Sequence, residues 1–139
     1  MGHKINQMGM NRILIVEDDM LLALVEERIV KKMGYEVIAK ASNAKDAFRF
    51  IDELKPDIIL MDNQLLGELH GLDIVERMRN EGNLTPVVFI SGECNLSQQE
   101  RAQNLNCVDY LVKPIYSDSL YEPLERAVDI AKELAMYAA

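Results

Sequence analysis

Four short apolar runs of the chain are each followed at once by polar residues that could carry out chemistry. They supply carboxylates, a hydroxyl and an ammonium, and in chain order they are Glu17, Asp18, Asp19, Asp62, Ser91 and Lys113. The carboxyl ends of parallel strands meet at one edge of a sheet, where such sheets bind their ligands. If the four runs are strands of one parallel sheet, these side chains gather at one place although they lie far apart in the sequence.

Clustered carboxylates repel one another, and a cation among them stabilises their ionised form. Oxygen ligands favour Mg²⁺, or Mn²⁺, over Zn²⁺, and the chain has neither a Cys-x-x-Cys pair nor clustered histidines. A cation, the Lys113 ammonium and the Ser91 hydroxyl can together hold the oxygens of a phosphoryl group. A carboxylate at this edge can then act as the nucleophile and form an aspartyl phosphate.

Each of these residues also has an ordinary structural interpretation. A single Asp after a strand is most often a helix cap or a solvated loop residue, and a run of acids suits the N-terminus of a helix. Taken alone, Ser91 fits a turn and Lys113 fits a surface position. Polar residues nevertheless end four of the five apolar runs, and this joint occurrence favours a functional site.

Five apolar runs alternate with amphipathic stretches from Arg12 onward. They are short and rich in β-branched residues, which is typical of strands covered on both faces. The predicted strands are residues 13–16, 37–39, 58–61, 87–90 and 110–112. Five strands that alternate with helices predict an α/β fold: a three-layer, doubly wound (βα)5 sandwich around a five-stranded parallel sheet.

Helical spacing and capping residues predict a helix after each strand. In the first helix, Leu22, Val25, Ile29 and Met33 are expected to face the sheet, and Gly34 to end the helix. The other expected markers are an Asn43 cap, a helix from about Gly71 to Asn80, a capping box of Ser97 and Glu100, and a break or kink at Pro123. The fourth helix has a thin apolar face, mainly Ala102 and Leu105, which is typical of a mobile element.

Length, composition and charge limit the classes of function. The 139 residues, 49% of them hydrophobic, predict one domain over residues 11–136 after a flexible lead-in, residues 1–10. The net charge of −8 disfavours binding to nucleic acid or to an anionic membrane surface. Neither a membrane span of about 20 apolar residues nor a signal-peptide pattern is present, so we expect a cytoplasmic protein with reduced cysteines.

Four segments of the chain resemble the receiver domain of bacterial response regulators. They are residues 13–18, 56–62, 86–92 and 109–114. Each segment is a weak signal alone, but their order and spacing are specific, and the resemblance covers about residues 11–135. It implies a flavodoxin-like sheet with strand order 2-1-3-4-5. It also implies a signalling protein without a separate enzymatic output domain, either a stand-alone receiver or a fragment of a longer regulator.

The resemblance implies a metal site and a phosphoacceptor among the acids. Asp62 matches the residue that accepts the phosphoryl group. Glu17 and Asp18 match the acidic pair, with Asp18 binding Mg²⁺ directly and Glu17 binding it through water. The backbone carbonyl of Gln64 is expected to complete the metal site. Asp19 lies one place beyond the pair and is expected to cap the first helix.

The resemblance also implies the phosphate-binding and switch residues. Lys113 matches the phosphate-binding lysine, followed by a cis peptide bond to Pro114. Ser91 matches the switch hydroxyl, and Tyr110 matches the aromatic residue whose rotamer reports activation.

The chain departs from the family pattern after Asp62. Leu66 stands where the family often has proline, and the loop of residues 63–70 is one residue longer than usual. These differences concern the shape of the loop and its partner surface more than the chemistry. His70 lies in this loop, and we interpret it as a solvated histidine rather than a catalytic base.

The expected partners are a sensor histidine kinase or a histidine phosphotransfer protein, which donates the phosphoryl group, and a downstream protein target. The protein is expected to be a monomer or a weak, phosphorylation-dependent dimer. Three other functions fit the sequence less well. A pseudo-receiver that only binds would have lost Asp62 or Lys113. A flavin-binding module would repel its phosphate with three acids in the first loop. A haloacid-dehalogenase-type phosphatase needs an acid at position 64, which is Gln64.

Overall fold

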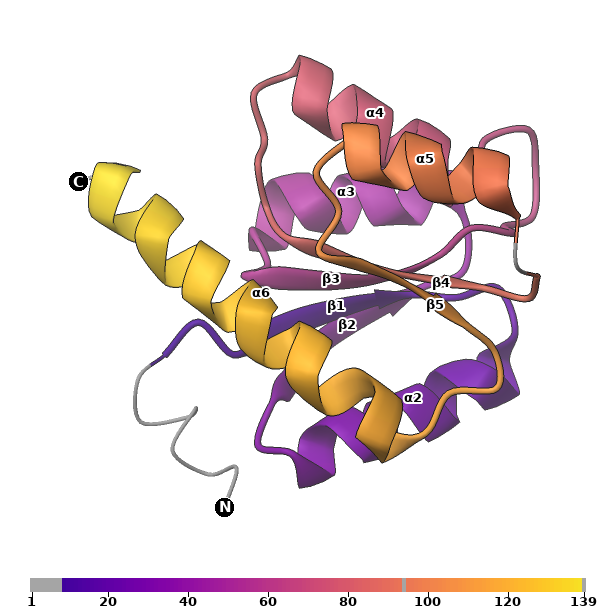
Figure 1. Cartoon of the computed structure of the whole chain (residues 1–139), viewed down its shortest axis with the longest axis horizontal. Helices are drawn as coiled ribbons and strands as arrows, with labels where there is room; N and C mark the ends of the chain where they lie inside the picture. The colour runs from indigo at the N-terminus through magenta and orange to yellow at the C-terminus, as the bar shows by residue number, and fades with distance from the viewer. Residues whose placement is uncertain (1–8, 94, 139) are drawn as a thin grey trace.

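The computed structural model describes residues 9–93 and 95–138 of the chain, and its strands and helices alternate strictly (Figure 1). In chain order they are β1 (Arg12–Val16), α2 (Met20–Lys32), β2 (Glu36–Ala41), α3 (Ala44–Leu54), β3 (Ile58–Asp62), α4 (Gly71–Asn80), β4 (Val87–Ser91), α5 (Leu96–Asn104), β5 (Asp109–Val112) and α6 (Ser117–Ala138). The predicted β-α alternation is confirmed. Most of the predicted lead-in, residues 1–8, lies outside the described residues.

The five strands form one parallel sheet in the order β2-β1-β3-β4-β5. This confirms the predicted fold class and strand order. Helices α3, α4 and α5 cover one face of the sheet, and α2 and α6 cover the other (Figure 1). Since all strands run in the same direction, their carboxyl ends share one edge of the sheet, and the residues that follow β1 and β3 become neighbours.

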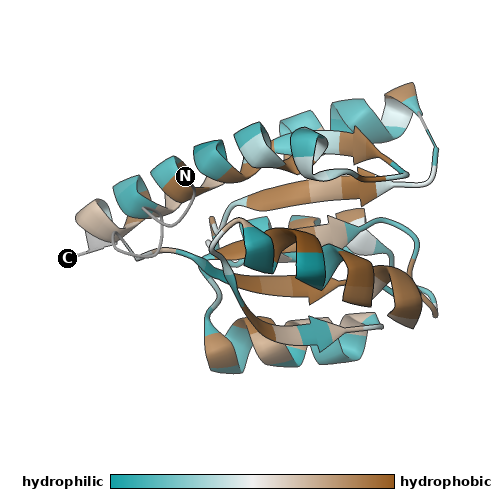
Figure 2. Cartoon of the chain, turned by 90° about the horizontal axis from the view of Figure 1, so that it is seen from below, coloured by the Kyte–Doolittle hydropathy of each residue, from teal (hydrophilic) through white to brown (hydrophobic). Residues whose placement is uncertain are grey.

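Alternate residues of the inner strands supply two separate apolar cores. In β1, Leu14 and Val16 pack toward α3, α4 and α5, whereas Ile13 and Ile15 pack toward α2 and α6. In Figure 2 the strands are mostly brown, the colour of apolar residues, and lie between the helix layers. Burial on both faces explains why the strands appear in the sequence as continuous apolar runs.

The predicted inner face of α2 is confirmed for Ile29 and Met33, which pack in the core, and is wrong for Leu22 and Val25. Ala23, Glu26 and Val30 face the sheet, while Leu22 is 36% exposed and Val25 is 46% exposed. The first two turns of α2 are apolar on nearly every side, so periodicity could not select a face. An acid at the centre of the buried face was not expected from the sequence.

The helix ends are partly as predicted. Asp19 caps α2, since its side chain accepts the backbone N–H groups of Leu21 and Leu22, and Asn43 caps α3. The cap of α5 is Asn95 rather than the predicted capping box, because the Asn95 side chain accepts the Gln98 N–H and places Ser97 inside the first turn. Helix α6 continues through Pro123 without the predicted break. None of the described helices is long and apolar enough to cross a membrane.

Candidate functional site

The site lies at the carboxyl edge of the sheet, and strand register positions its residues. Glu17 follows β1, and its backbone N–H donates to the Ala41 carbonyl at 2.9 Å. Asp62 is the last residue of β3. Ser91 ends β4, and its carbonyl accepts the backbone N–H of Lys113 at 2.8 Å. The predicted meeting of four strand ends is therefore present.

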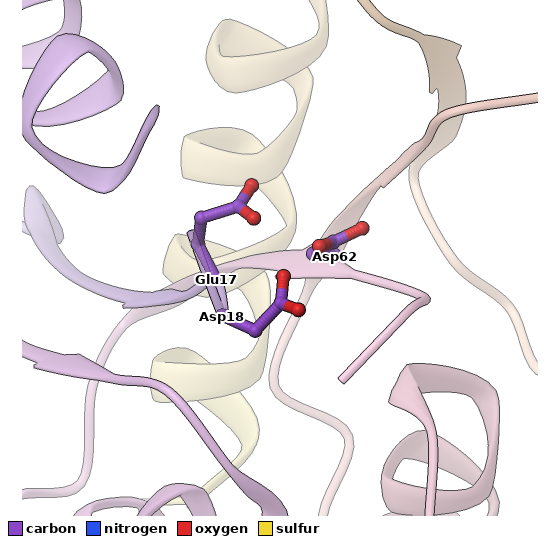
Figure 3. A group of neighbouring side chains, drawn as sticks. All are labelled: Glu17, Asp18 and Asp62. Atoms are coloured by element: carbon purple, nitrogen blue, oxygen red, sulfur yellow. The ribbon is translucent and has the colours of Figure 1, made fainter. Parts of the chain in front are cut away.

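Three carboxyl groups gather at this edge. One oxygen each from Glu17, Asp18 and Asp62 lie within 4.8 Å of one another, and Figure 3 shows these side chains between the ends of β1 and β3. Glu17 and Asp62 are each only 1% exposed, whereas Asp18 is half-buried. The half-buried Asp18 leaves the cluster open to solvent on one side.

Lys113 is the cation that faces these acids. Its Nζ lies 3.1 Å from Glu17 Oε1 and 3.2 Å from Asp62 Oδ2. The ammonium approaches both oxygens at ion-pair distance but not along a hydrogen-bonding direction, and these two buried oxygens accept no hydrogen bond from the described residues. Buried carboxylate oxygens without a donor are suited to a hard cation such as Mg²⁺.

Burial and mutual repulsion give the acids of the site different pKa values. Burial, together with the neighbouring carboxyl group and charge of Glu17, raises the pKa of Asp62 to about 7. Burial would also raise the pKa of Glu17, but its interactions with Asp62 and Glu26, the hydrogen bond from the Asp19 backbone N–H and the charge of Lys113 lower it overall. Burial disfavours the Lys113 ammonium, yet the charges of Asp62 and Glu17 raise its pKa.

The predicted switch residues lie on the neighbouring strands. Ser91 is fully buried, and its Oγ accepts the Glu93 backbone N–H at 3.3 Å. The Tyr110 ring stacks on Phe89 with centroids 5.8 Å apart. The Tyr110 hydroxyl lies 2.8 Å from Gln98 Oε1, so it contacts the first turn of α5. The predicted cis peptide bond joins Lys113 to Pro114.

The loop after Asp62 has contacts that sequence reasoning missed. Asn63 is buried, and its side chain and carbonyl accept the backbone N–H groups of Leu72 and Gly71. His70 is exposed as expected, but it has two hydrogen-bond partners. Its ring Nδ1 accepts the Leu65 backbone N–H at 3.4 Å, and its backbone N–H donates to the Asp73 side chain. His70 therefore helps to shape the loop and to begin α4.

Gln64 and Glu26 also lie next to the acids of the site. The Gln64 N–H donates to Asp62 Oδ1 at 3.3 Å, while the proposed role of the Gln64 carbonyl stays a prediction. Glu26, which was not singled out from the sequence, is buried, and burial together with the neighbouring Glu17 carboxyl group raises its pKa to about 9. The sequence gives no signal for its burial, because Glu26 stands directly before the charged residues Glu27 and Arg28.

Comparison with known proteins agrees with this geometry. The family model described as "Response regulator receiver domain" matches residues 13–125. The chain belongs to this family. Receiver domains are signalling modules that bind Mg²⁺ at an acidic pocket, are phosphorylated by histidine kinases and act on downstream targets.

Relatives of the receiver domain differ in length. The chain is 31% identical over 118 residues to "Chemotaxis protein CheY" of Listeria monocytogenes, covering 85% of this chain and 98% of that protein. It is 36% identical to the "Positive alginate biosynthesis regulatory protein" of Pseudomonas aeruginosa, covering 83% of this chain but 46% of the relative. The signal receiver domain of a LuxO repressor protein from Vibrio parahaemolyticus superposes with a TM-score of 0.84 at 25% identity, covering 93% of this chain and 98% of that one.

Proposed function

We propose that this receiver domain accepts a phosphoryl group on Asp62 from the phosphohistidine of a histidine kinase or a histidine phosphotransfer protein. The observation that carries the proposal is the cluster of three acids and Lys113 at the ends of β1, β3 and β5. An Asp62 oxygen forms the new O–P bond while the P–N bond of the phosphohistidine breaks, and the bonding electron pair leaves with the imidazole nitrogen.

Each residue of the site has one task in this proposal. Asp18, Asp62 and the Gln64 carbonyl would hold Mg²⁺ directly, and Glu17 would hold it through water. When bound, the ion would supply a positive charge against the phosphoryl oxygens. Lys113 supplies a second positive charge, and it is already within 3.2 Å of the acceptor carboxyl group. The phosphoryl group therefore meets two positive charges that require little rearrangement of the protein.

The phosphorylated domain then changes the surface formed by α5, β5 and α6. Ser91 gains a phosphoryl oxygen as a charge-assisted hydrogen-bond partner. Tyr110 lies on the adjacent strand and its hydroxyl contacts Gln98 at the start of α5. Only Ala102 is buried among the residues of α5, so a modest bias can shift this helix between two packed states. A downstream protein target reads the shift.

An apolar surface beside the site suits the protein that donates the phosphoryl group. The large exposed apolar side chains of α2 are Met20, Leu21, Leu22, Leu24 and Val25. Next to them, α2 and the loop after β5 form a groove of about 370 Å³ that Lys113 also lines. Contiguous exposed apolar side chains favour a protein interface. A phosphohistidine carried on this face would lie close to Asp62. Such donors act in the cytoplasm, where we expect this protein.

The test combines a small phosphodonor with Mg²⁺ and measures intact mass. The wild type should gain one phosphoryl group, and alkaline hydroxylamine should remove it. Asp62→Asn should gain none, whereas the exposed Asp52→Asn on α3 removes the same charge elsewhere and should behave as the wild type. Equal phosphorylation of Asp62→Asn would refute the assignment. A wild type that gains nothing would favour the alternative, a pseudo-receiver that acts only by binding.

A further inference from the structure

Asn63 is a buried polar residue for which the proposed phosphoryl transfer gives no role. It directly follows Asp62, the last residue of β3, and it is 6% exposed. Its backbone N–H donates to the Ile90 carbonyl at 3.0 Å, so the pairing of β3 with β4 continues one residue past the end of β3. A buried carboxamide costs free energy unless its polar atoms are bonded, and an apolar side chain would avoid that cost. The carboxamide therefore needs a physical reason.

The two oxygens of Asn63 bind the start of α4. Its backbone carbonyl accepts the Gly71 N–H at 2.8 Å, and its side-chain Oδ1 accepts the Leu72 N–H at 3.2 Å. The first N–H groups of a helix have no acceptor within the helix, and a residue next to the helix usually supplies one. Here the acceptors come from a residue nine positions before Leu72. The start of α4 is therefore fastened to the residue that follows Asp62.

Gly71 brings α4 close enough for these bonds. A Cβ on this residue would lie 2.3 Å from the backbone oxygen of Asp62 and 2.9 Å from the Phe89 ring. Only glycine fits such a close approach of two backbones. The start of α4, Asn63 and the backbone of Asp62 thus form one closely packed unit.

The peptide group between Asn63 and Gln64 links this anchoring to the acceptor carboxyl group. Its carbonyl is the one that binds the Gly71 N–H, and its N–H, which belongs to Gln64, donates to Asp62 Oδ1 at 3.3 Å. Asp62 Oδ2 accepts no hydrogen bond from the described residues and lies 3.2 Å from Lys113 Nζ. The two oxygens of the carboxyl group therefore differ, because one is tied to the backbone and the other faces the ammonium.

We propose that Asn63 is a positioning residue for Asp62: its side chain binds α4 and so holds the peptide group that follows it with the N–H on Asp62 Oδ1, which leaves Oδ2 to face Lys113. Without the side-chain oxygen of Asn63, the Leu72 N–H has no partner, the start of the loop loosens, and the Asp62 carboxyl group is free to rotate. A misplacement of about 1 Å can lower a rate by about 100-fold. The inference rests on the proposed function, because it concerns the same acceptor residue.

The decisive comparison uses two substitutions of Asn63. Asn63→Leu fills the space without an acceptor, while Asn63→Asp keeps the acceptor, and a helix N-terminus favours its charge. With a small phosphodonor and saturating Mg²⁺, we expect Asn63→Leu to accept the phosphoryl group about tenfold more slowly than the wild type and Asn63→Asp to stay within about threefold. The control is Asp73→Ala, which removes the acceptor of the His70 N–H and weakens the start of α4 by another route. The rate of this control should stay within about twofold.

A second readout needs neither metal nor phosphodonor. Amide hydrogen exchange should show the Gln64 N–H of the wild type protected by at least about tenfold. Asn63→Leu should remove this protection, whereas Asn63→Asp and Asp73→Ala should keep it. The wild-type measurement stands even if Asn63→Leu does not fold.

Four results would overturn the inference. An unprotected Gln64 N–H in the wild type refutes the anchored peptide directly. Unchanged phosphoryl uptake in Asn63→Leu would mean that the side chain only caps the helix, and equal slowing in Asn63→Leu and Asn63→Asp would mean that the acceptor oxygen is not what matters. Equal slowing in Asn63→Leu and Asp73→Ala would mean that any weakening of α4 has the same effect. A wild type that accepts no phosphoryl group contradicts the proposed function instead, and the exchange measurement still tests the anchored peptide.

Discussion

Replacing Asp18 by Asn tests whether the acid cluster is built for a cation. One carboxylate oxygen of Asp18 lies within 4.8 Å of oxygens of both Glu17 and Asp62. Two like charges at that separation repel by about 3.5 kcal/mol at an effective dielectric constant near 20, and by about 0.9 kcal/mol in bulk water. Asp18 is half-buried and Lys113 offsets part of the charge, so the relevant cost is about 1–2 kcal/mol.

The substitution should have opposite effects with and without the ion. Without Mg²⁺, Asp18→Asn relieves repulsion and should raise the melting temperature by roughly 3–10 °C for a domain of this size. With Mg²⁺ at 100 times its dissociation constant, the wild type should gain about 2.7 kcal/mol of stability. Asp18→Asn should lose most of that gain, because a carboxamide is a weaker ligand than a carboxylate for a hard cation.

The assay is a thermal melt of each variant with and without Mg²⁺, using Ca²⁺-free buffer at constant ionic strength. Asp19→Asn is the control: it removes the same charge one residue away, lies outside the three-acid cluster and keeps a side chain that caps α2 as well as Asp does. An undiminished Mg²⁺-dependent shift in Asp18→Asn would refute the reasoning. So would a shift lost equally in both variants.

Three further outcomes are expected. Gly71→Ala should destabilise the protein by about 1–3 kcal/mol in denaturant melts, because a Cβ at residue 71 would lie 2.3 Å from the backbone oxygen of Asp62. The control Gly92→Ala should be neutral, because a Cβ there meets nothing within 4 Å. Burial raises the pKa of the Cys107 thiol to about 11. Alkylation of Cys107 at pH 8, measured by peptide mass, should therefore be at least about 100-fold slower than that of a free thiol, and its rate should rise with pH. Ser91→Ala should still accept the phosphoryl group, but beryllofluoride should then move the amide resonances around Tyr110 less than in the wild type.

The sequence was sufficient for the sheet because both faces of the inner strands β1, β3 and β4 are buried. Continuous apolar runs such as 58–61 have few structural alternatives, and the alternation with helices leaves little choice of topology. The orientation of α2 was not predictable from apolar spacing, since Leu22 and Val25 fit an inner face as well as Ala23 and Val30 do. An inner face that includes Ala23 and Val30 also includes Glu26, and a buried acid is not expected there.

Site residues that end a strand were predictable from the sequence. Residues whose place depends on tertiary contacts were less predictable. Asp62 and Lys113 are marked by their position after apolar runs, which fixes where their backbones lie. The burial of Glu26 on the inner face of α2 depends on how far this helix rotates about its axis, which no local pattern records. The partner of His70 likewise depends on how the loop folds back toward Leu65.

The distance in sequence between the members of the site has a consequence for protein synthesis. Glu17 and Lys113 are 96 residues apart and come from the first and the last strand of the chain, on either side of the contributions of β3 and β4. Under the proposed function, a nascent chain that has not yet added β5 lacks the Lys113 ammonium that would hold the phosphoryl group, and one that has not paired β1 with β3 does not bring Glu17 and Asp18 beside Asp62. The ability to receive the phosphoryl group would therefore appear only with the completed sheet.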